Sequence, residues 1–141
     1  MKHDPFADLE QLVQRVYAYV AYRLGDGPDA ERVTAQTFDM AFRHRAAFDP
    51  RQDDPAVWLI AFARWQLKQR ALPEPVAADY TDLRGAVETL PADERELVAL
   101  RYGADLTAAQ MEAVLELDPG VVDTELRPIL SRLRHTTVLV V

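Results

Sequence analysis

The side chains that usually carry out enzyme chemistry are few in this sequence and far apart along it. Its three histidines, His3, His44 and His135, do not stand near a pair of carboxylates at the spacing of a metal site. The chain has no cysteine, which excludes disulfides, thiolate metal sites and cysteine nucleophiles. It also has neither a glycine-rich loop for a phosphate nor a grouping of serine, histidine and aspartate. The sequence therefore predicts a protein that is not an enzyme, with no metal ion and no cofactor.

A different kind of chemistry, the reading of DNA, is indicated by the stretch from Leu106 to Leu126. Its apolar pattern is laid out like a helix-turn-helix, but it contains neither lysine nor arginine. Its acidic residues are Glu112, Glu116, Asp118, Asp123 and Glu125. Affinity for DNA depends on cations that meet phosphates, and the second helix of such a motif must enter the major groove between two rows of phosphate. The pattern predicts a DNA-binding ancestry, whereas the charge predicts weakened DNA binding.

The acidic residues of the chain are concentrated in its second half. Residues 1–72 hold ten lysines and arginines and ten acids, whereas residues 73–141 hold six and thirteen, so the net charge of −7 lies entirely in the second half. Such an asymmetry indicates two units with different partners, or alternatively a solvated acidic surface that keeps the protein soluble. The start of the chain lacks a secretory signal and no apolar stretch approaches the roughly 18 residues of a membrane span. We therefore expect a cytoplasmic protein with no membrane partner.

The elements that must position these residues are predicted to be helices. Three Asp-Pro pairs, at 4–5, 54–55 and 118–119, combine a capping side chain with a proline at the first helical position. In the first half we expect helices over 5–24, 28–48 and 55–72. The last of these is apolar nearly all round at its start, which predicts the buried central helix of a bundle.

The second half begins with a linker that the prolines at 73 and 75 separate from the preceding helix, and we expect this linker over 73–79. Helices are expected over 80–90 and 91–102, followed by a short helix that begins with a capping box from Thr107 to Gln110. The uncharged tail, residues 136–141, would be an aggregation hazard if exposed. It is expected to dock on its own domain, or alternatively to pair with a partner or a second copy.

Together these residues resemble the small bacterial sigma factors of the extracytoplasmic-function group. In the first half the resemblance is carried by Asp29-Ala30-Glu31, Thr37-Phe38, Ala41-Phe42, Phe48-Asp49-Pro50, Trp58-Leu59 and Ala63-Arg64. In the second half it is carried by Leu90-Pro91, Glu94-Arg95-Glu96, Leu100-Arg101-Tyr102, Leu106-Thr107, Val114-Leu115, Gly120-Val121-Val122 and Leu126. It implies an all-α fold of two small domains, a three-helix bundle like sigma region 2 over 1–72 and a helix-turn-helix domain like sigma region 4 over 80–135.

The resemblance also implies partners and binding residues. The partners would be core RNA polymerase, promoter DNA and an anti-sigma factor, whereas the oligomeric state is left open. The residues placed to contact polymerase would be Asp29, Arg32 and Gln36. The residues placed to meet the −10 strand would be Arg64, Trp65, Lys68 and Arg70. The residues placed near the −35 element would be Asp123, Thr124, Arg127 and Arg132.

The sequence departs from the family pattern mainly at functional positions. Trp65 replaces the base-reading asparagine; its face could stack on an unpaired base, or it could pack in the core or between domains. Glu112 replaces a small residue, and Glu116 replaces the turn glycine at an expected strain of about 1 kcal/mol. Pro128 inside the last helix costs about 3 kcal/mol unless the helix kinks or restarts there. Arg32 stands where the family has an acid.

The linker is short for a factor that reaches two separate promoter elements. From Arg70 to Tyr80 a fully extended chain covers about 35 Å at most. This length favours a closed arrangement, in which the two halves pack against each other. Two functions remain: a divergent sigma factor with weakened or unusual −35 recognition, and a sigma-like interaction protein that binds a protein such as an anti-sigma factor and does not read promoters.

Overall fold

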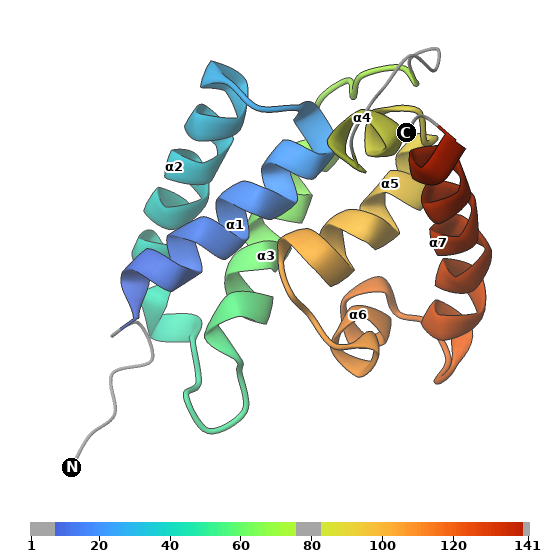
Figure 1. The fold of residues 1–141 in the computed structure, drawn as a ribbon. Coiled ribbons are helices and arrows are strands. Elements are labelled where there is room, and N and C mark those ends of the chain that lie inside the picture. Colours follow the sequence, from blue (N-terminus) through green and yellow to red (C-terminus); the bar gives the residue numbers. More distant parts are fainter. Residues whose placement is uncertain (1–7, 76–82, 140–141) are drawn as a thin grey trace.

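The computed structural model describes the backbone of residues 8–75 and 83–139 and the side chains of residues 8–75 and 85–134. Within these ranges it is helical and has no strand, so the all-α fold is confirmed (Figure 1). The first half contains α1 (Leu9–Leu24), α2 (Pro28–Arg43), the short 3-10 helix η1 (Arg45–Ala47) and α3 (Pro55–Lys68). The second half contains α4 (Leu83–Glu88), α5 (Ala92–Val98), the π-helical turn η2 (Ala99–Gly103), α6 (Ala108–Leu115) and α7 (Val121–Leu139).

Local signals set several helix ends as expected. The Asp54 carboxylate accepts a hydrogen bond from the Val57 amide at 3.1 Å and so caps α3. α1 ends at Leu24, and Gly25 follows with a φ of 91°, a value that glycine adopts at little cost. α2 and α3 end earlier than predicted, at Arg43 and Lys68. The predicted Asp4-Pro5 start and most of the predicted linker, residues 76–79, lie outside the described residues.

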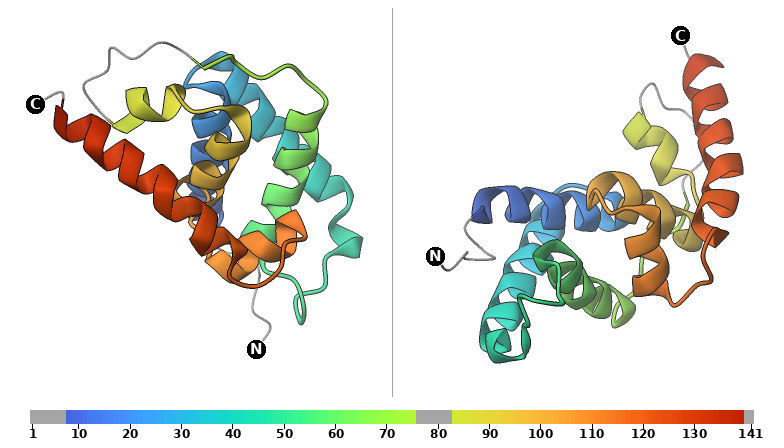
Figure 2. Two further views of the ribbon diagram at one scale, coloured as in Figure 1. Left: turned by 90° about the vertical axis from the view of Figure 1, so that its right-hand side faces the viewer. Right: turned by 90° about the horizontal axis from the view of Figure 1, so that it is seen from below.

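The central helix of the molecule is α1. It packs against α2 and α3 on one side and against α5 and η2 on the other (Figures 1 and 2). Val16, Tyr19 and Val20 are consequently fully buried. The prediction of a central third helix is wrong, because α3 buries only one face and leaves Trp65 about half exposed, at 55%.

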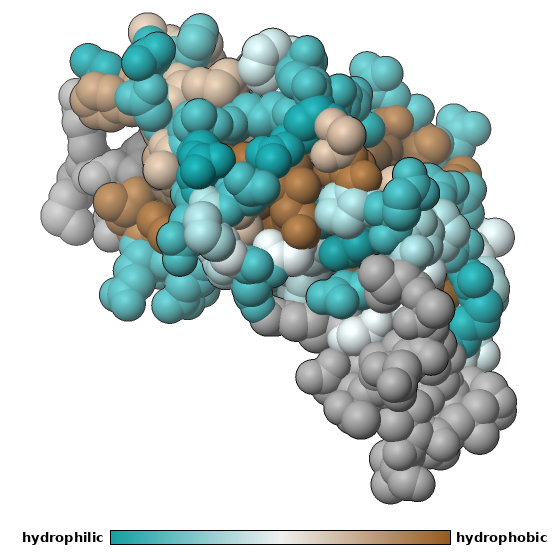
Figure 3. Space-filling model, turned by 90° about the horizontal axis from the view of Figure 1, so that it is seen from above, coloured by the Kyte–Doolittle hydropathy of each residue, from teal (hydrophilic) through white to brown (hydrophobic). Residues whose placement is uncertain are grey.

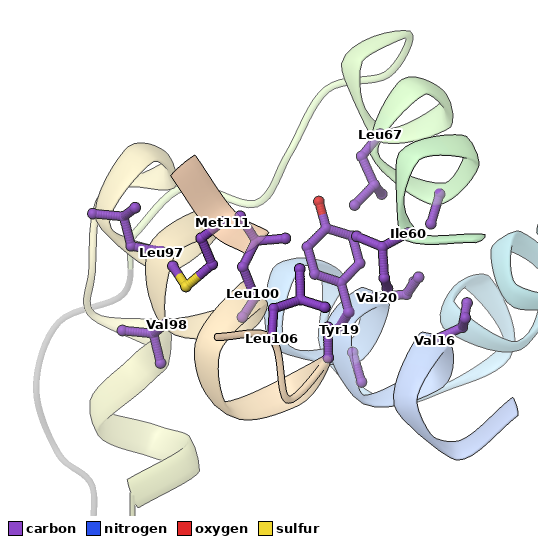
Figure 4. Close-up of a cluster of buried hydrophobic side chains, with 14 of the residues drawn as sticks. Val16, Tyr19, Val20, Ile60, Leu67, Leu97, Val98, Leu100, Leu106 and Met111 are labelled. Atoms are coloured by element: carbon purple, nitrogen blue, oxygen red, sulfur yellow. The ribbon is translucent and has the colours of Figure 1, made fainter. Parts of the chain in front are cut away.

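Buried side chains from both halves form one continuous core. In Figure 4 the Tyr19 ring lies between Leu100 and Leu106 of the second half and Ile60 and Leu67 of the first. The backbones also touch there, because a Cβ atom placed on Gly103 would stand only 2.9 Å from the Tyr19 Cα. The structure therefore has the closed arrangement that the short linker favours.

α7 is a single helix on the outer side of the second half, far from α2 (Figure 2). It runs through Pro128 without ending there, although the proline cannot donate a backbone hydrogen bond. It also runs through residues 136–139, which were expected to form a separate tail. The side chains of these residues, and with them the predicted docking of the tail, lie outside the described part of the chain.

The face seen from above in Figure 3 is mainly hydrophilic, with small hydrophobic areas between charged side chains. Among the described residues, no helix has both the length and the apolar composition required to cross a bilayer. The same residues contain no cluster of metal-binding side chains.

Candidate functional site

α3 presents the four predicted strand-binding residues in two different directions. Arg64 and Lys68 stand one turn apart and line a cleft of about 730 Å³ between the two halves. Trp65 and Arg70 instead line a groove between α2 and α3, together with Gln36. We call these the inter-half cleft and the α2–α3 groove. The structure therefore does not bring the four residues together on one surface.

Arg64 is held by a carboxylate of the second half. Its Nε donates to Oε1 of Glu96 at 2.7 Å. The other oxygen of Glu96 accepts from the Tyr19 hydroxyl at 2.8 Å and from the Arg23 guanidinium. The Glu96 side chain is only 10% exposed, so a buried negative charge is balanced by two cations and a hydroxyl. We call this set of residues the Glu96 clasp, and it joins α1, α3 and α5.

The clasp makes the free energy of unfolding depend on pH in the alkaline range. Burial, followed by the charge of Glu96, raises the pKa of the Tyr19 hydroxyl well above its ordinary value of 10.0. The unfolded chain releases this proton near pH 10 while the folded chain retains it, so the stabilisation is complete below pH 10.0 and is lost as the pH rises further. Urea unfolding at about pH 8 and at about pH 11 should show that the free energy of unfolding falls more between these two pH values for the native chain than for Tyr19→Phe. Equal declines would contradict this assignment.

The two walls of the inter-half cleft carry opposite charges. The first half contributes Arg23, Arg64 and Lys68. The second half contributes the acids Asp93, Glu94, Glu96 and Glu125, together with Arg132, which pairs with Glu94 at 2.7 Å. Opposite charges across such a gap favour the closed arrangement, and the acidic wall repels a polyanion.

One of the three residues predicted to contact polymerase lines the α2–α3 groove. Gln36 lines it, while Asp29 and Arg32 are exposed at the start of α2. Asp29 pairs with Arg32 at 2.9 Å and with Arg70 at 3.2 Å, so Arg70 belongs to this surface. Trp65 is also here and is open to solvent, because α3 turns its opposite face, with Ala63 and Leu67, to the core. The expectation that Trp65 packs in the core or between domains is wrong.

The start of α7 is capped from the preceding helix. Oε2 of Glu112 in α6 accepts hydrogen bonds from the Gly120 amide at 2.9 Å and the Val122 amide at 3.1 Å. The predicted cap by Asp118 with Pro119 at the first helical position is wrong, since α7 begins at Val121. A negative charge at these amides is favoured by the helix dipole. Glu112 therefore occupies the backbone donors that could otherwise hold a phosphate.

Loss of this cap should weaken the fold. We expect Glu112→Ala to lower the free energy of unfolding by about 1–2 kcal/mol, as for other lost caps. Glu125→Ala is the matched control, because Glu125 is exposed on α7, and it should change stability by less than about 0.5 kcal/mol. Thermal unfolding of the three proteins measures the difference, and equal stability of both variants would exclude a capping role.

Comparisons with known proteins agree with this architecture. No family model matches the chain. The sequence is 26% identical over 147 residues to the ECF RNA polymerase sigma factor BldN of Streptomyces coelicolor, covering 86% of this chain and 56% of BldN. The fold is similar, with a TM-score of 0.73, to that of the sigma factor RpoE co-crystallised with the anti-sigma factor NepR from Bartonella quintana. That match covers 92% of this chain and 93% of RpoE, at 16% identity. The chain resembles extracytoplasmic-function sigma factors.

The chain spans little more than half the length of BldN, so the match concerns part of that relative. The resemblance inferred from the sequence is thus confirmed at the level of family likeness and fold.

In this sigma-like chain the residues predicted near the −35 element do not form a basic surface. Asp123 and Arg127 are exposed on α7. The Thr124 hydroxyl donates to the Gly120 carbonyl at 3.0 Å, and Arg132 is paired with Glu94. Two of the four side chains are therefore engaged within the second half.

The turn before α7 carries the backbone strain that the sequence predicts. Glu116 has φ 59° and ψ 47°, the left-handed conformation in which a side chain is unfavourable. We expect Glu116→Gly to raise the free energy of unfolding by about 1 kcal/mol. Glu125→Gly, inside α7, should instead lower it by about 1 kcal/mol. Thermal unfolding distinguishes the two, and the same sign for both would contradict the assignment of strain.

Proposed function

We propose that the chain is a divergent sigma-type factor that acts in transcription initiation through core RNA polymerase, with weakened recognition of the −35 element. One observation carries this proposal: the α2–α3 face stays open in the closed arrangement. Asp29, Arg32, Gln36 and Trp65 are all exposed there. The likeness to BldN and RpoE supports a sigma-factor role for a chain with this face.

The charge of the helix-turn-helix supports the weakened −35 recognition. Asp123 and Glu125 are exposed in the first turns of α7, where a reading helix enters the major groove. Glu112 covers the free amides at the start of the same helix. Phosphates would meet repulsion on this surface, so promoter affinity would depend on the first half and on polymerase.

The proposal is tested by binding of the full chain to purified core polymerase and by transcription from a promoter library. Gln36→Arg places a charge in the α2–α3 groove, and we expect it to weaken polymerase binding about tenfold or more, equivalent to about 1.4 kcal/mol. Gln14→Arg, on the exposed side of α1, is the matched control and should bind like the native chain. A chain that neither binds core polymerase nor directs transcription would refute the proposal.

A second candidate function is favoured by the closed arrangement itself. A sigma-like protein whose halves stay together could bind a protein such as an anti-sigma factor without reading promoters. RpoE, which shares this fold, was crystallised with an anti-sigma factor. Capture of an anti-sigma factor by the full chain, without any binding of core polymerase, would favour this function over the first. Salt-sensitive binding of the full chain to duplex −35 DNA would count against it.

A further inference from the structure

We propose that Glu96 autoinhibits the chain by filling an anion site on the first half. The site is formed by Arg23 and Arg64, and its ligand in the open state is a phosphate of a single nucleic-acid strand. The inference rests on the proposed function in one respect, namely that α3 faces a DNA strand. Closure by Glu96 and strand binding by Arg64 would then exclude each other.

The contacts of Glu96 are those expected for a phosphate. One oxygen accepts from Nε of Arg64 at 2.7 Å, and the other accepts from the Tyr19 hydroxyl at 2.8 Å and from the Arg23 guanidinium. Arginine side chains bind carboxylates and phosphates with the same planar set of donors. All three donors belong to the first half, whereas the acceptor belongs to the second.

Further contacts hold the same two surfaces together. Nε of Arg15 donates to the Ala104 carbonyl at 2.7 Å, and Nε of Arg95 donates to the Tyr22 carbonyl. Gly103 lies directly against the backbone of Tyr19, where a Cβ atom would not fit without a shift. Closure thus follows from contacts within the chain and requires no second protein.

The cleft explains why a strand cannot reach Arg64 in the closed state. Arg64 and Lys68 line one wall, and the opposite wall carries Asp93 and Glu125. A phosphate that approaches Lys68 therefore meets carboxylates within the same cleft, and Nε of Arg64 already donates to Glu96. Because only the open fraction of molecules can bind, the apparent dissociation constant exceeds the intrinsic one by the inverse of that fraction.

The test uses Glu96→Gln with Glu94→Gln as its control. Both variants remove one negative charge from α5, but Glu94 pairs with Arg132 inside the second half, whereas Glu96 pairs with Arg23 and Arg64 of the first. Dyes on cysteines introduced at Glu31 and Ser131, both exposed, report the separation of the halves in this cysteine-free chain. A labelled single-stranded DNA oligonucleotide reports strand binding. Glu96→Gln should lower energy transfer and tighten strand binding about tenfold or more, whereas Glu94→Gln should change neither.

A second variant opens the halves without any change of charge. Gly103→Ala introduces a Cβ atom against the Tyr19 backbone, so it should also lower energy transfer and tighten strand binding. Adding Arg64→Gln to either opened variant should remove most of the gain, because the phosphate loses one of the two cations of its site. Circular dichroism confirms that each variant is folded, and if Glu96→Gln does not fold, Gly103→Ala carries the test.

Unchanged energy transfer in both opened variants would overturn the proposal. Separation of the halves with no gain in strand binding would overturn it as well, since the Arg23–Arg64 site would then take no phosphate. Core polymerase binding by the native chain is measured separately. Its failure would refute the proposed function, while the energy-transfer result would still decide whether Glu96 closes the molecule.

Discussion

Replacement of Tyr19 by alanine is expected to lower the free energy of unfolding by about 3–5 kcal/mol, the range for large aromatic residues in cores. The Tyr19 side chain is fully buried. Its ring contacts apolar side chains of both halves, so the cavity would open at their junction (Figure 4). Glu96 would also lose one of its three donors. Urea unfolding of the native and variant chains measures the effect.

Two further tyrosine variants separate packing from hydrogen bonding. Tyr19→Phe keeps the ring and removes the hydroxyl. It should lower the free energy of unfolding by about 1–3 kcal/mol, because Glu96 loses the hydrogen bond that this hydroxyl donates. Tyr17→Ala removes a half-buried ring on the same helix, whose hydroxyl donates to the exposed Asp26, and should cost less than Tyr19→Ala. Equal losses for Tyr17→Ala and Tyr19→Ala would mean that the junction of the halves is not part of the core.

Features that depend on neighbouring residues could be predicted from the sequence. The cap by Asp54 and the capping box of Thr107 and Gln110 are both present. The left-handed turn at Glu116 is present as well. Each of these is decided within about one helical turn, where side chain and backbone partner are adjacent along the chain.

The central helix could not be predicted, because burial depends on distant partners. The apolar start of α3 suggested burial on all sides, yet Trp65 on this helix is 55% exposed. α1 carries polar residues such as Arg15 and Arg23 as well as its apolar ones. These side chains are used across the junction, where Arg15 meets the Ala104 carbonyl and Arg23 meets Glu96.

The arrangement of the candidate site also depends on contacts between residues that are distant in the sequence. The resemblance placed Arg64 and Trp65 on one binding surface, but neighbours on a helix point about 100° apart. The structure separates them into the cleft and the groove. Glu112 was read only as an oversized replacement, whereas it reaches amides eight and ten residues away. Asp118 was the cap expected from the sequence, so Glu112 was not assigned this role.

Replacement of Arg23 by methionine is expected to lower the free energy of unfolding by about 3–5 kcal/mol, because it removes one partner of a buried ion pair. The side chains of Arg23 and Glu96 are each only 10% exposed. Arg64 stays in contact with Glu96 and should keep the loss near the lower end of this range. Arg132→Met is the matched control. The Arg132 side chain is 56% exposed, so its pair with Glu94 should contribute only about 0–1 kcal/mol to the free energy of unfolding.

The double variant Arg23→Met with Glu96→Leu decides whether the loss comes from an unbalanced buried charge. With both members apolar, neither charge is stranded in the core, and Arg64 is exposed enough at 23% to turn to water. The double variant should therefore be more stable than Arg23→Met alone in urea unfolding. It should also separate the halves, because Glu96→Leu removes the acceptor through which Arg64 ties α3 to α5. Recovery of stability without separation would assign closure to the apolar core and the Arg15 contacts, and would remove Glu96 as the residue that keeps the molecule shut.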